Sequence, residues 1–180
     1  MRLFTIGHSN HTIDKLVRLL ADNGVDLLID VRTAPYSRFS PQFNKENLET
    51  ALLRPGIEYA HAGKYLGGRP SDPACYKSRM LPPEGTDYLH EVDYPEVMQR
   101  EWFIKGIDRL FELAAEKTIA IMCTEEDPAE CHRHHLIAQY LMGEHPEVEI
   151  RHIRADGTAY GARSIHTSVD KPSVEQLSLF

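Results

Sequence analysis

Polar side chains able to carry out acid–base or nucleophilic chemistry follow three short apolar runs of the sequence. We expect these runs to be strands, and ligands bind beyond the carboxyl ends of the strands in a parallel sheet. If the three strands are neighbours, their side chains share one edge of the sheet and form one site. The candidate catalytic residues are Asp30, Cys123, Glu125 and His132, and the candidate substrate-binding residues are His8, Ser9, Arg32, Ser37, Arg38 and Arg133.

Asp30 and Arg32 are two residues apart on an expected strand and therefore point to the same face. They could form a buried ion pair that only orders the following loop. Alternatively, the planar fork of Arg32 could bind a phosphate or a carboxylate, and the sequence leaves both interpretations open. In that loop Ser37 and Arg38 stand beside Phe39. Basic residues interleaved with the aromatic residues Phe39 and Phe43 suit phosphate contact and base stacking, although the commoner case is that these rings only fix the loop to the core.

Cys123 stands between an apolar run and the expected start of a helix, where the helix dipole lowers a thiol pKa and favours a nucleophile. The acidic residues that follow would raise this pKa and repel an anionic substrate. A buried structural cysteine is therefore the favoured interpretation. Glu125 is the better candidate for a general acid or base, although acids at a helix start also stabilise the helix without any catalytic role.

Cys131, His132, His134 and His135 form a dense group of side chains that suit zinc or iron. On the expected helix Cys131 and His135 share one face, whereas the other two histidines diverge from it. The spacing does not match that of paired-cysteine metal sites. We therefore expect no bound metal and no other cofactor, with a metal at Cys131 and His135 as the less favoured alternative. We expect Arg133 to reach an acid of the preceding loop.

Alternating strands and helices must position these side chains. Strands are expected over residues 3–6, 25–31, 57–60, 118–123 and 148–153, and helices between Thr12 and Gly24 and over residues 44–53, 95–116 and 130–143. This order predicts an α/β fold, namely a three-layer domain with a mainly parallel sheet and helices on both faces. The domain is expected over residues 1–154, with an irregular excursion over 64–91, and residues 155–180 are expected to form a flexible tail.

Composition sets the broad class of protein. The chain has 180 residues, 42% of them apolar, which suits a single domain with a tail. Its apolar runs are too short to span a bilayer and its start lacks a secretory signal, so we expect a cytoplasmic protein with no membrane partner. Three cysteines are too few for a disulfide framework. The net charge of −7 argues against coating nucleic acid by bulk charge, but residues 32–79 carry +4 and permit a local basic face.

Together these motifs resemble the bacterial family called domain of unknown function 488. The resemblance covers about residues 2–153 and rests on Thr5-Ile6-Gly7-His8-Ser9, Asp30-Val31-Arg32 with Pro35 and Ser37-Arg38-Phe39, Ile57-Glu58-Tyr59, Leu66-Gly67-Gly68, Cys123-Thr124-Glu125 and Cys131-His132-Arg133. It implies a compact cytoplasmic α/β domain whose matching residues form a shared pocket. It implies no activity, because the family has none assigned.

A weaker likeness is to the rhodanese-type sulfurtransferases. It rests on one strand that ends in Asp-Val-Arg and a later strand that ends in cysteine before a helix. In those proteins backbone amides of a short loop surround a thiolate. The acidic loop after Cys123 departs from that pattern and argues against transfer chemistry.

The last five residues, Gln176-Leu177-Ser178-Leu179-Phe180, resemble the peptide by which bacterial polymerases and repair proteins dock on the DNA sliding clamp. Leu179 and Phe180 would fill an apolar pocket, Leu177 would support them, and Gln176 would form hydrogen bonds at a second site. Alternatively, the apolar residues fold back on the domain. Docking would hold an acidic protein close to DNA, because tethering raises local concentration without new contacts.

We therefore expect a DNA-associated accessory or processing protein of replication or repair. It would be tethered to the DNA polymerase sliding clamp, and its strand-end pocket would bind nucleic acid or a nucleotide. Whether it is an enzyme stays open. The alternatives are a rhodanese-like, thiol-dependent small-molecule enzyme with a low-pKa Cys123, a metal-binding protein, and a non-catalytic ligand-binding module.

Overall fold

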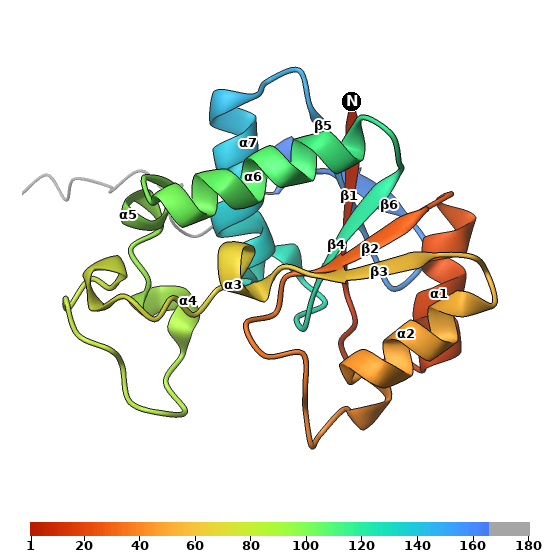
Figure 1. Ribbon diagram of the computed structural model, residues 1–180, viewed down its shortest axis with the longest axis horizontal. Coiled ribbons are helices and arrows are strands. Elements are labelled where there is room, and N and C mark those ends of the chain that lie inside the picture. Colours follow the sequence, from red (N-terminus) through yellow and green to blue (C-terminus); the bar gives the residue numbers. More distant parts are fainter. Residues whose placement is uncertain (166–180) are drawn as a thin grey trace, which may run out of the picture.

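A single six-stranded sheet forms the centre of the molecule, which a computed structural model describes over residues 1–165. The strand order is β3-β2-β4-β1-β5-β6 (Figure 1). The strands are β1 (Arg2–Gly7), β2 (Leu27–Asp30), β3 (Glu58–His61), β4 (Ile119–Cys123), β5 (Glu149–Ile153) and β6 (Ala159–Gly161). Strands β1 to β5 run parallel, and β6 pairs antiparallel with β5. The expected α/β fold with a mainly parallel sheet is confirmed.

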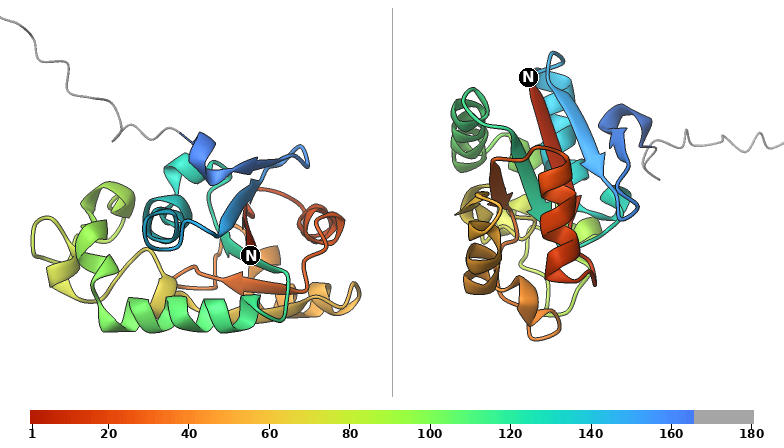
Figure 2. Two further views of the ribbon diagram at one scale, coloured as in Figure 1. Left: turned by 90° about the horizontal axis from the view of Figure 1, so that it is seen from above. Right: turned by 90° about the vertical axis from the view of Figure 1, so that its right-hand side faces the viewer.

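Helices cover both faces of this sheet, giving the three expected layers (Figure 2). One face is covered by α1 (Ile13–Asp22) and α2 (Lys45–Leu53). The other is covered by α3 (Gly63–Leu66), α5 (Tyr94–Met98), α6 (Glu101–Ala114), a π-helix (Arg133–Ala138) and α7 (Gln139–Glu144). The helix α4 (Tyr88–Glu91) and four 3₁₀ turns (Pro41–Phe43, Pro73–Cys75, Pro128–Glu130 and Ala162–Ser164) complete the described elements.

The period-2 alternation of the strands builds the two apolar cores. Leu27 and Ile29 face the layer of α6, whereas Leu28 faces the layer of α1 and α2. Every residue of β4 is buried, as expected for a central parallel strand covered on both faces. No helix within residues 1–165 is long and apolar enough to cross a membrane.

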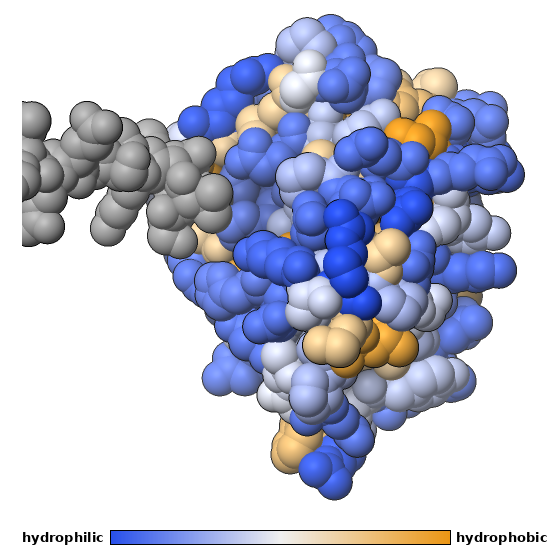
Figure 3. Space-filling model, turned by 90° about the vertical axis from the view of Figure 1, so that its left-hand side faces the viewer, coloured by the Kyte–Doolittle hydropathy of each residue, from blue (hydrophilic) through white to orange (hydrophobic). Residues whose placement is uncertain are grey.

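Two expected helices differ in detail from the structure. The helix expected over 95–116 is two helices, α5 and α6, because the backbone of Arg100 is extended, with φ −76° and ψ 133°. The helix expected over 130–143 starts at Arg133 and begins with six residues of π-helix. The segment over 64–91 is mostly irregular, as expected, although it contains α3, one 3₁₀ turn and α4. Its side of the molecule is largely hydrophilic with small apolar areas (Figure 3).

The sheet continues beyond residue 154, where we expected the tail to begin. Residues 159–161 form β6, which pairs with β5 through a hairpin turn at Asp156-Gly157. Gly157 has φ +88°, and the Asp156 carboxylate accepts a hydrogen bond from the Thr158 backbone amide. This dipeptide is a turn signal that the sequence contained, and the short strand after it was not predicted.

The topology opens a crevice between the carboxyl ends of β2 and β4. These strands are neighbours, and β1 lies on the other side of β4, as the site hypothesis required. The chain that leaves β2 leads to α2 on one face, whereas the chain that leaves β4 leads to the π-helix on the opposite face. Segments that depart in opposite directions leave a space between them, which is where ligands bind in open α/β sheets.

Gly7 allows the loop after β4 to pass directly over the end of β1. A Cβ atom at this position would lie 1.7 Å from the Glu125 carbonyl oxygen, a backbone atom that cannot move aside. We predict that Gly7→Ala lowers the free energy of unfolding by more than about 2 kcal/mol, measured by urea denaturation. Gly143→Ala in α7 is the control, because a Cβ there meets nothing within 4 Å and alanine favours a helix. Equal stability of the two variants would contradict the close approach.

Candidate functional site

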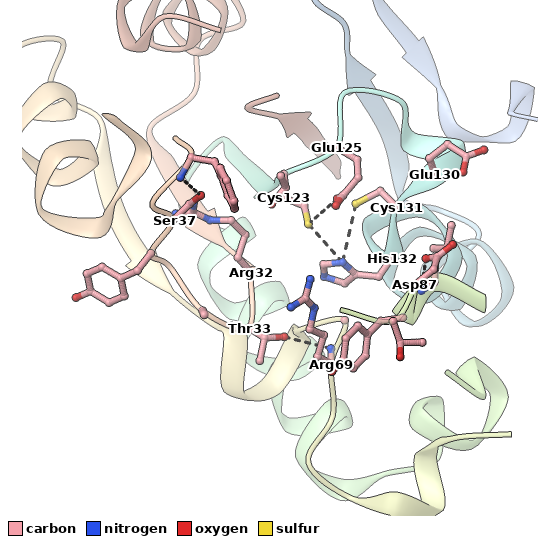
Figure 4. Close-up of a pocket in the computed structure, with 18 of the residues that line it drawn as sticks. Arg32, Thr33, Ser37, Arg69, Asp87, Cys123, Glu125, Glu130, Cys131 and His132 are labelled. Atoms are coloured by element: carbon pink, nitrogen blue, oxygen red, sulfur yellow. Dashed lines mark hydrogen bonds between the residues drawn. The ribbon is translucent and has the colours of Figure 1, made fainter. Parts of the chain in front are cut away.

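A cavity of about 830 Å³ lies in the crevice between β2 and β4. Its walls come from three segments that are distant in the sequence: residues 32–39 after β2, residues 68–94 after α3, and residues 123–132 after β4. Figure 4 shows that Arg32, Thr33 and Ser37 lie on one side of this cavity. Glu130 and Asp87 lie on the other side.

Two thiols and one imidazole meet between these walls. The Nδ1 atom of His132 lies 3.4 Å from Cys123 Sγ and 3.9 Å from Cys131 Sγ (Figure 4). The Glu125 Oε2 atom lies 3.2 Å from Cys123 Sγ. Cys123 is the last residue of β4, and Cys131 and His132 immediately precede the π-helix. The structure therefore brings together Cys123, Glu125 and His132, three of the four predicted catalytic residues, and adds Cys131 to them.

The two thiols differ strongly in acidity. A hydrogen bond with Cys131, together with burial, raises the pKa of Cys123 well above its ordinary value. Burial also raises the pKa of Cys131, but the hydrogen bond from Cys123 and the positive charge of Arg133 outweigh it and lower that pKa well below its ordinary value. The more acidic thiol is Cys131, which differs from the low-pKa Cys123 of the rhodanese-type interpretation.

The charge of this centre also changes the acidity of its neighbours. Burial in the cavity wall and the negative charge of Cys131 raise the pKa of Glu125, which favours a carboxylic acid that can carry a proton. Burial lowers the pKa of His132, but its hydrogen bond with Cys131 and that thiolate's charge raise it by more. The predicted role of Glu125 as an acid or base is chemically consistent with this environment.

Two buried polar atoms beside the thiols have no hydrogen-bond partner among the described residues. They are His132 Nε2 and the Tyr94 hydroxyl, and both residues line the cavity. Gly68 packs against the His132 ring, where a Cβ atom would lie 2.6 Å from Cγ. Because buried polar groups in folded proteins are nearly always hydrogen-bonded, these two atoms indicate a place for a ligand.

The sequence left two interpretations of Asp30 and Arg32, and the structure contains the ion pair. Arg32 Nη2 lies 2.6 Å from Asp30 Oδ2, and both side chains are buried. The guanidinium also donates to the Phe43 carbonyl oxygen at 2.8 Å and lies 3.3 Å from His8 Nε2. The Tyr59 hydroxyl donates to the same carboxylate at 2.8 Å. The Arg32 fork is therefore occupied by protein groups, and Asp30 lies behind the cavity wall rather than in it.

Three further predicted residues also lie outside the cavity lining of the described chain. His8 is buried and stacks on Phe43, and its burial lowers its pKa to about 4. The backbone amide of Ser9 donates to the Thr124 carbonyl oxygen at 2.7 Å. Arg133 is completely buried beneath the loop after β4. These residues support the walls, whereas we predicted that they bind substrate.

Arg133 contacts backbone oxygens rather than an acidic side chain, which corrects the expectation from the sequence. It donates to the carbonyl oxygens of Glu125 at 2.5 Å and Glu126 at 2.6 Å, and to the hydroxyl of Thr5 at 3.3 Å. The Glu126 carboxylate is paired with Arg154 instead, at 2.7 Å. Arg133 thus joins β1, the loop and the π-helix.

Two arginines are exposed at the mouth of the cavity, and each lies over an aromatic ring. Arg38 lies 4.8 Å from the centre of the Phe39 ring, and Arg69 lies 4.6 Å from that of Tyr88. Phe39 is 83% exposed, so it does not fix the loop to the core. Phe43, which is fully buried, does so.

The loop conformation that presents Arg38 is fixed by its neighbour Ser37. The Ser37 hydroxyl accepts hydrogen bonds from the backbone amides of Phe39 and Ser40. Arg69 was not predicted as a site residue. Its signal was the Gly67-Gly68 pair just before it, which lets this segment lie against His132.

The structure groups Cys131 with Cys123 and His132 rather than with His135, the partner in the alternative metal site. The Nε2 atom of His135 lies 2.6 Å from the Ala129 carbonyl oxygen, and its ring stacks on Tyr94. Its neighbour His132 faces the thiols instead. The predicted partner-binding residues Gln176, Leu177, Leu179 and Phe180 lie outside the residues that the structure describes.

Comparison with known proteins identifies one family. A family model described as domain of unknown function DUF488 matches residues 12–141. The matched range contains every residue that lines the cavity. No curated protein and no solved structure matches the chain.

The buried ion pair gives a prediction for stability. We expect Asp30→Leu to lower the free energy of unfolding by about 3–5 kcal/mol, because it leaves the Arg32 charge buried without a counter-ion. The double variant Asp30→Leu with Arg32→Met removes both charges, and we expect it to be more stable than Asp30→Leu alone. Urea denaturation of the wild type, both single variants and the double variant measures the coupling. Additive losses would show that the two groups do not depend on each other.

Proposed function

The chain belongs to the DUF488 family, and because that description states no activity, we propose a function from the site: the cavity binds an unpaired nucleotide. The nucleotide would be part of single-stranded or locally opened DNA, or free in solution. The protein would act as an accessory or processing protein of replication or repair. The single observation that carries this proposal is the pair of exposed arginines, each lying over an aromatic ring, in a cavity that is also lined by four carboxylates.

Each wall suits one part of a nucleotide. Arg38 and Arg69 can contact phosphate, and the exposed ring of Phe39 can stack on a base. Carboxylates accept hydrogen bonds from the amino groups of bases, as they do from cytosine N4. The acids available for this line the same cavity: Glu84, Asp87, Glu125 and Glu130. The volume of about 830 Å³ lies within the range of roughly 300–1,000 Å³ typical of small-ligand sites.

The charge balance favours one nucleotide unit over a long duplex. The lining contains three arginines, of which Arg32 is paired with Asp30, and four acids. Duplex binding by phosphate neutralisation needs many free cations, which this cavity does not supply. A base that is already unpaired costs little to insert, because no stacking or pairing has to be broken. A processing role would use Glu125 as a proton donor beside the bound base.

Delivery of the protein to DNA is the second part of the proposal. The peptide Gln176-Leu177-Ser178-Leu179-Phe180 would dock on the sliding clamp and keep the cavity near replication or repair intermediates. This part is supported by the sequence alone. It explains how a protein with a net charge of −7 would work on DNA without a large basic surface.

Nucleotide binding predicts a specific pattern in oligonucleotide titrations. Arg69→Ala and Phe39→Ala should each weaken binding of a fluorescent single strand at least about fivefold, because each removes a phosphate contact or a stacking surface. Fluorescence anisotropy measures the affinity. Two phosphate contacts should give a slope of about −1.4 for the logarithm of the binding constant against that of salt concentration. Arg109→Ala on α6 is the control, because Arg109 is exposed and pairs with Glu112 away from the cavity. Equal losses in all three variants, or tighter binding of a fully paired duplex, would refute the proposal.

Clamp docking predicts that the terminal aromatic residue dominates affinity. Phe180→Ala should abolish binding to purified bacterial sliding clamp in isothermal calorimetry, because it removes the anchor of an apolar pocket. Ser178→Ala, between the anchors, should bind almost as tightly as the wild type. Unchanged affinity of Phe180→Ala would reject the tether and leave the nucleotide proposal standing.

A further inference from the structure

We propose that Cys123, Cys131 and His132 bind a zinc ion whose fourth coordination position opens into the cavity. This site goes beyond the proposed function, because it can be occupied whether or not nucleotides bind. Within residues 1–165 these three residues form the one group of at least three metal-ligand side chains whose donor atoms lie close enough to share an ion.

The donor atoms already have the spacing of a zinc site. All three lie within 4.8 Å of one another, and His132 Nδ1 is 3.4 Å and 3.9 Å from the two sulfur atoms. Zinc bonds of about 2.3 Å to sulfur and about 2.0 Å to nitrogen, at a tetrahedral angle, place those atoms roughly 3.5 Å apart. Binding would therefore need only small movements of the side chains.

The donor types select zinc over the common hard cations. Two thiols and an imidazole suit zinc, whereas magnesium and calcium prefer oxygen ligands. Two thiolates would balance the ion's charge. The backbone amide of Arg133 also donates to Cys131 Sγ at 3.5 Å, and such contacts to a ligand sulfur help to fix a metal site.

Rigid elements hold all three ligands. Cys123 belongs to the central strand β4, and Cys131 and His132 lie between a 3₁₀ turn and the π-helix. Arg133 holds the intervening loop through two of its carbonyl oxygens. Because the ligands are fixed by folding, little conformational entropy would be lost when the ion binds.

The surroundings of the fourth position point to a ligand from solvent or substrate. Three protein ligands with an open position are typical of catalytic zinc sites, whereas structural sites use four. The Tyr94 hydroxyl and His132 Nε2, both buried and unpartnered among the described residues, line the same cavity. Glu125, whose Oε2 lies 3.2 Å from Cys123 Sγ, lines the same cavity and would be the carboxyl group available to exchange a proton with a ligand at that position.

Elemental analysis of protein purified without a histidine tag tests the site, with no nucleic acid present. The proposal predicts about one zinc per chain, and loss of most of it in Cys131→Ala and in His132→Ala. Cys75→Ala is the matched control, because Cys75 is also a buried free thiol but is not part of the group. Circular dichroism checks that each variant is folded. Zinc that persists in both site variants, or that is lost equally in Cys75→Ala, overturns the proposal.

Cobalt substitution of the wild-type chain keeps the proposal testable if the variants do not fold. The reduced protein, titrated with cobalt, should show tetrahedral visible bands and a sulfur-to-cobalt charge-transfer band that saturate at one equivalent. Equimolar zinc should displace them. A reduced protein that binds neither metal, or a cobalt spectrum without the sulfur band, overturns the proposal. These readouts do not involve DNA, so their failure is distinct from failure of nucleotide binding.

Discussion

The hydrogen bonds of one buried guanidinium fix the geometry on which the candidate site depends. Arg133 is fully buried, and a charge in such a place must have its N–H groups satisfied. The carbonyl oxygens of Glu125 and Glu126 satisfy them, so the loop after β4 is held down over the end of β1. That position requires Gly7 beneath the loop, and it sets Glu125 beside Cys123.

The opposite wall is also held by a buried arginine, which has different hydrogen-bond partners. Arg32 is paired with Asp30 and donates to the Phe43 carbonyl oxygen, which fixes the start and end of the loop after β2. That loop then presents Ser37, Arg38 and Phe39 at the mouth of the cavity. The two buried arginines therefore shape the walls, while Arg38 and Arg69 stay exposed and lie over aromatic rings.

The centre of the cavity combines groups that are costly to bury. Two buried thiols, Cys123 and Cys131, the carboxyl group of Glu125 and two unpartnered polar atoms among the described residues lie within one small region. Such an arrangement does not stabilise the folded state, because apolar side chains buried in the same place would cost less free energy. Proteins retain groups of this kind chiefly where they bind a ligand or react with one, and the proposed zinc site lies in this region.

The sequence by itself determined the architecture and the edge of the sheet where the site lies. The spacing of apolar residues predicted the first five strands and the helices on both faces of the sheet. Burial of one side of a strand or helix makes apolar residues recur at a fixed short interval, which can be read from the sequence. The motifs after β2 and β4 identified Ser37, Arg38, Cys123, Glu125 and His132, all of which line the cavity. The Asp156-Gly157 turn was visible in the sequence, but the three-residue strand after it was too short to predict.

Only the tertiary structure decided which polar residues line the cavity and which support its walls from behind. Arg32 and Arg133 have the residue type of a binding site, and the Phe43 and Glu126 carbonyl oxygens to which they donate are backbone atoms that no side-chain pattern reveals. Likewise, an ideal helix directs His135 toward Cys131, whereas the observed backbone directs His132 there. Burial and hydrogen bonding between segments distant in the chain decide these roles, and they exist only once the chain has folded.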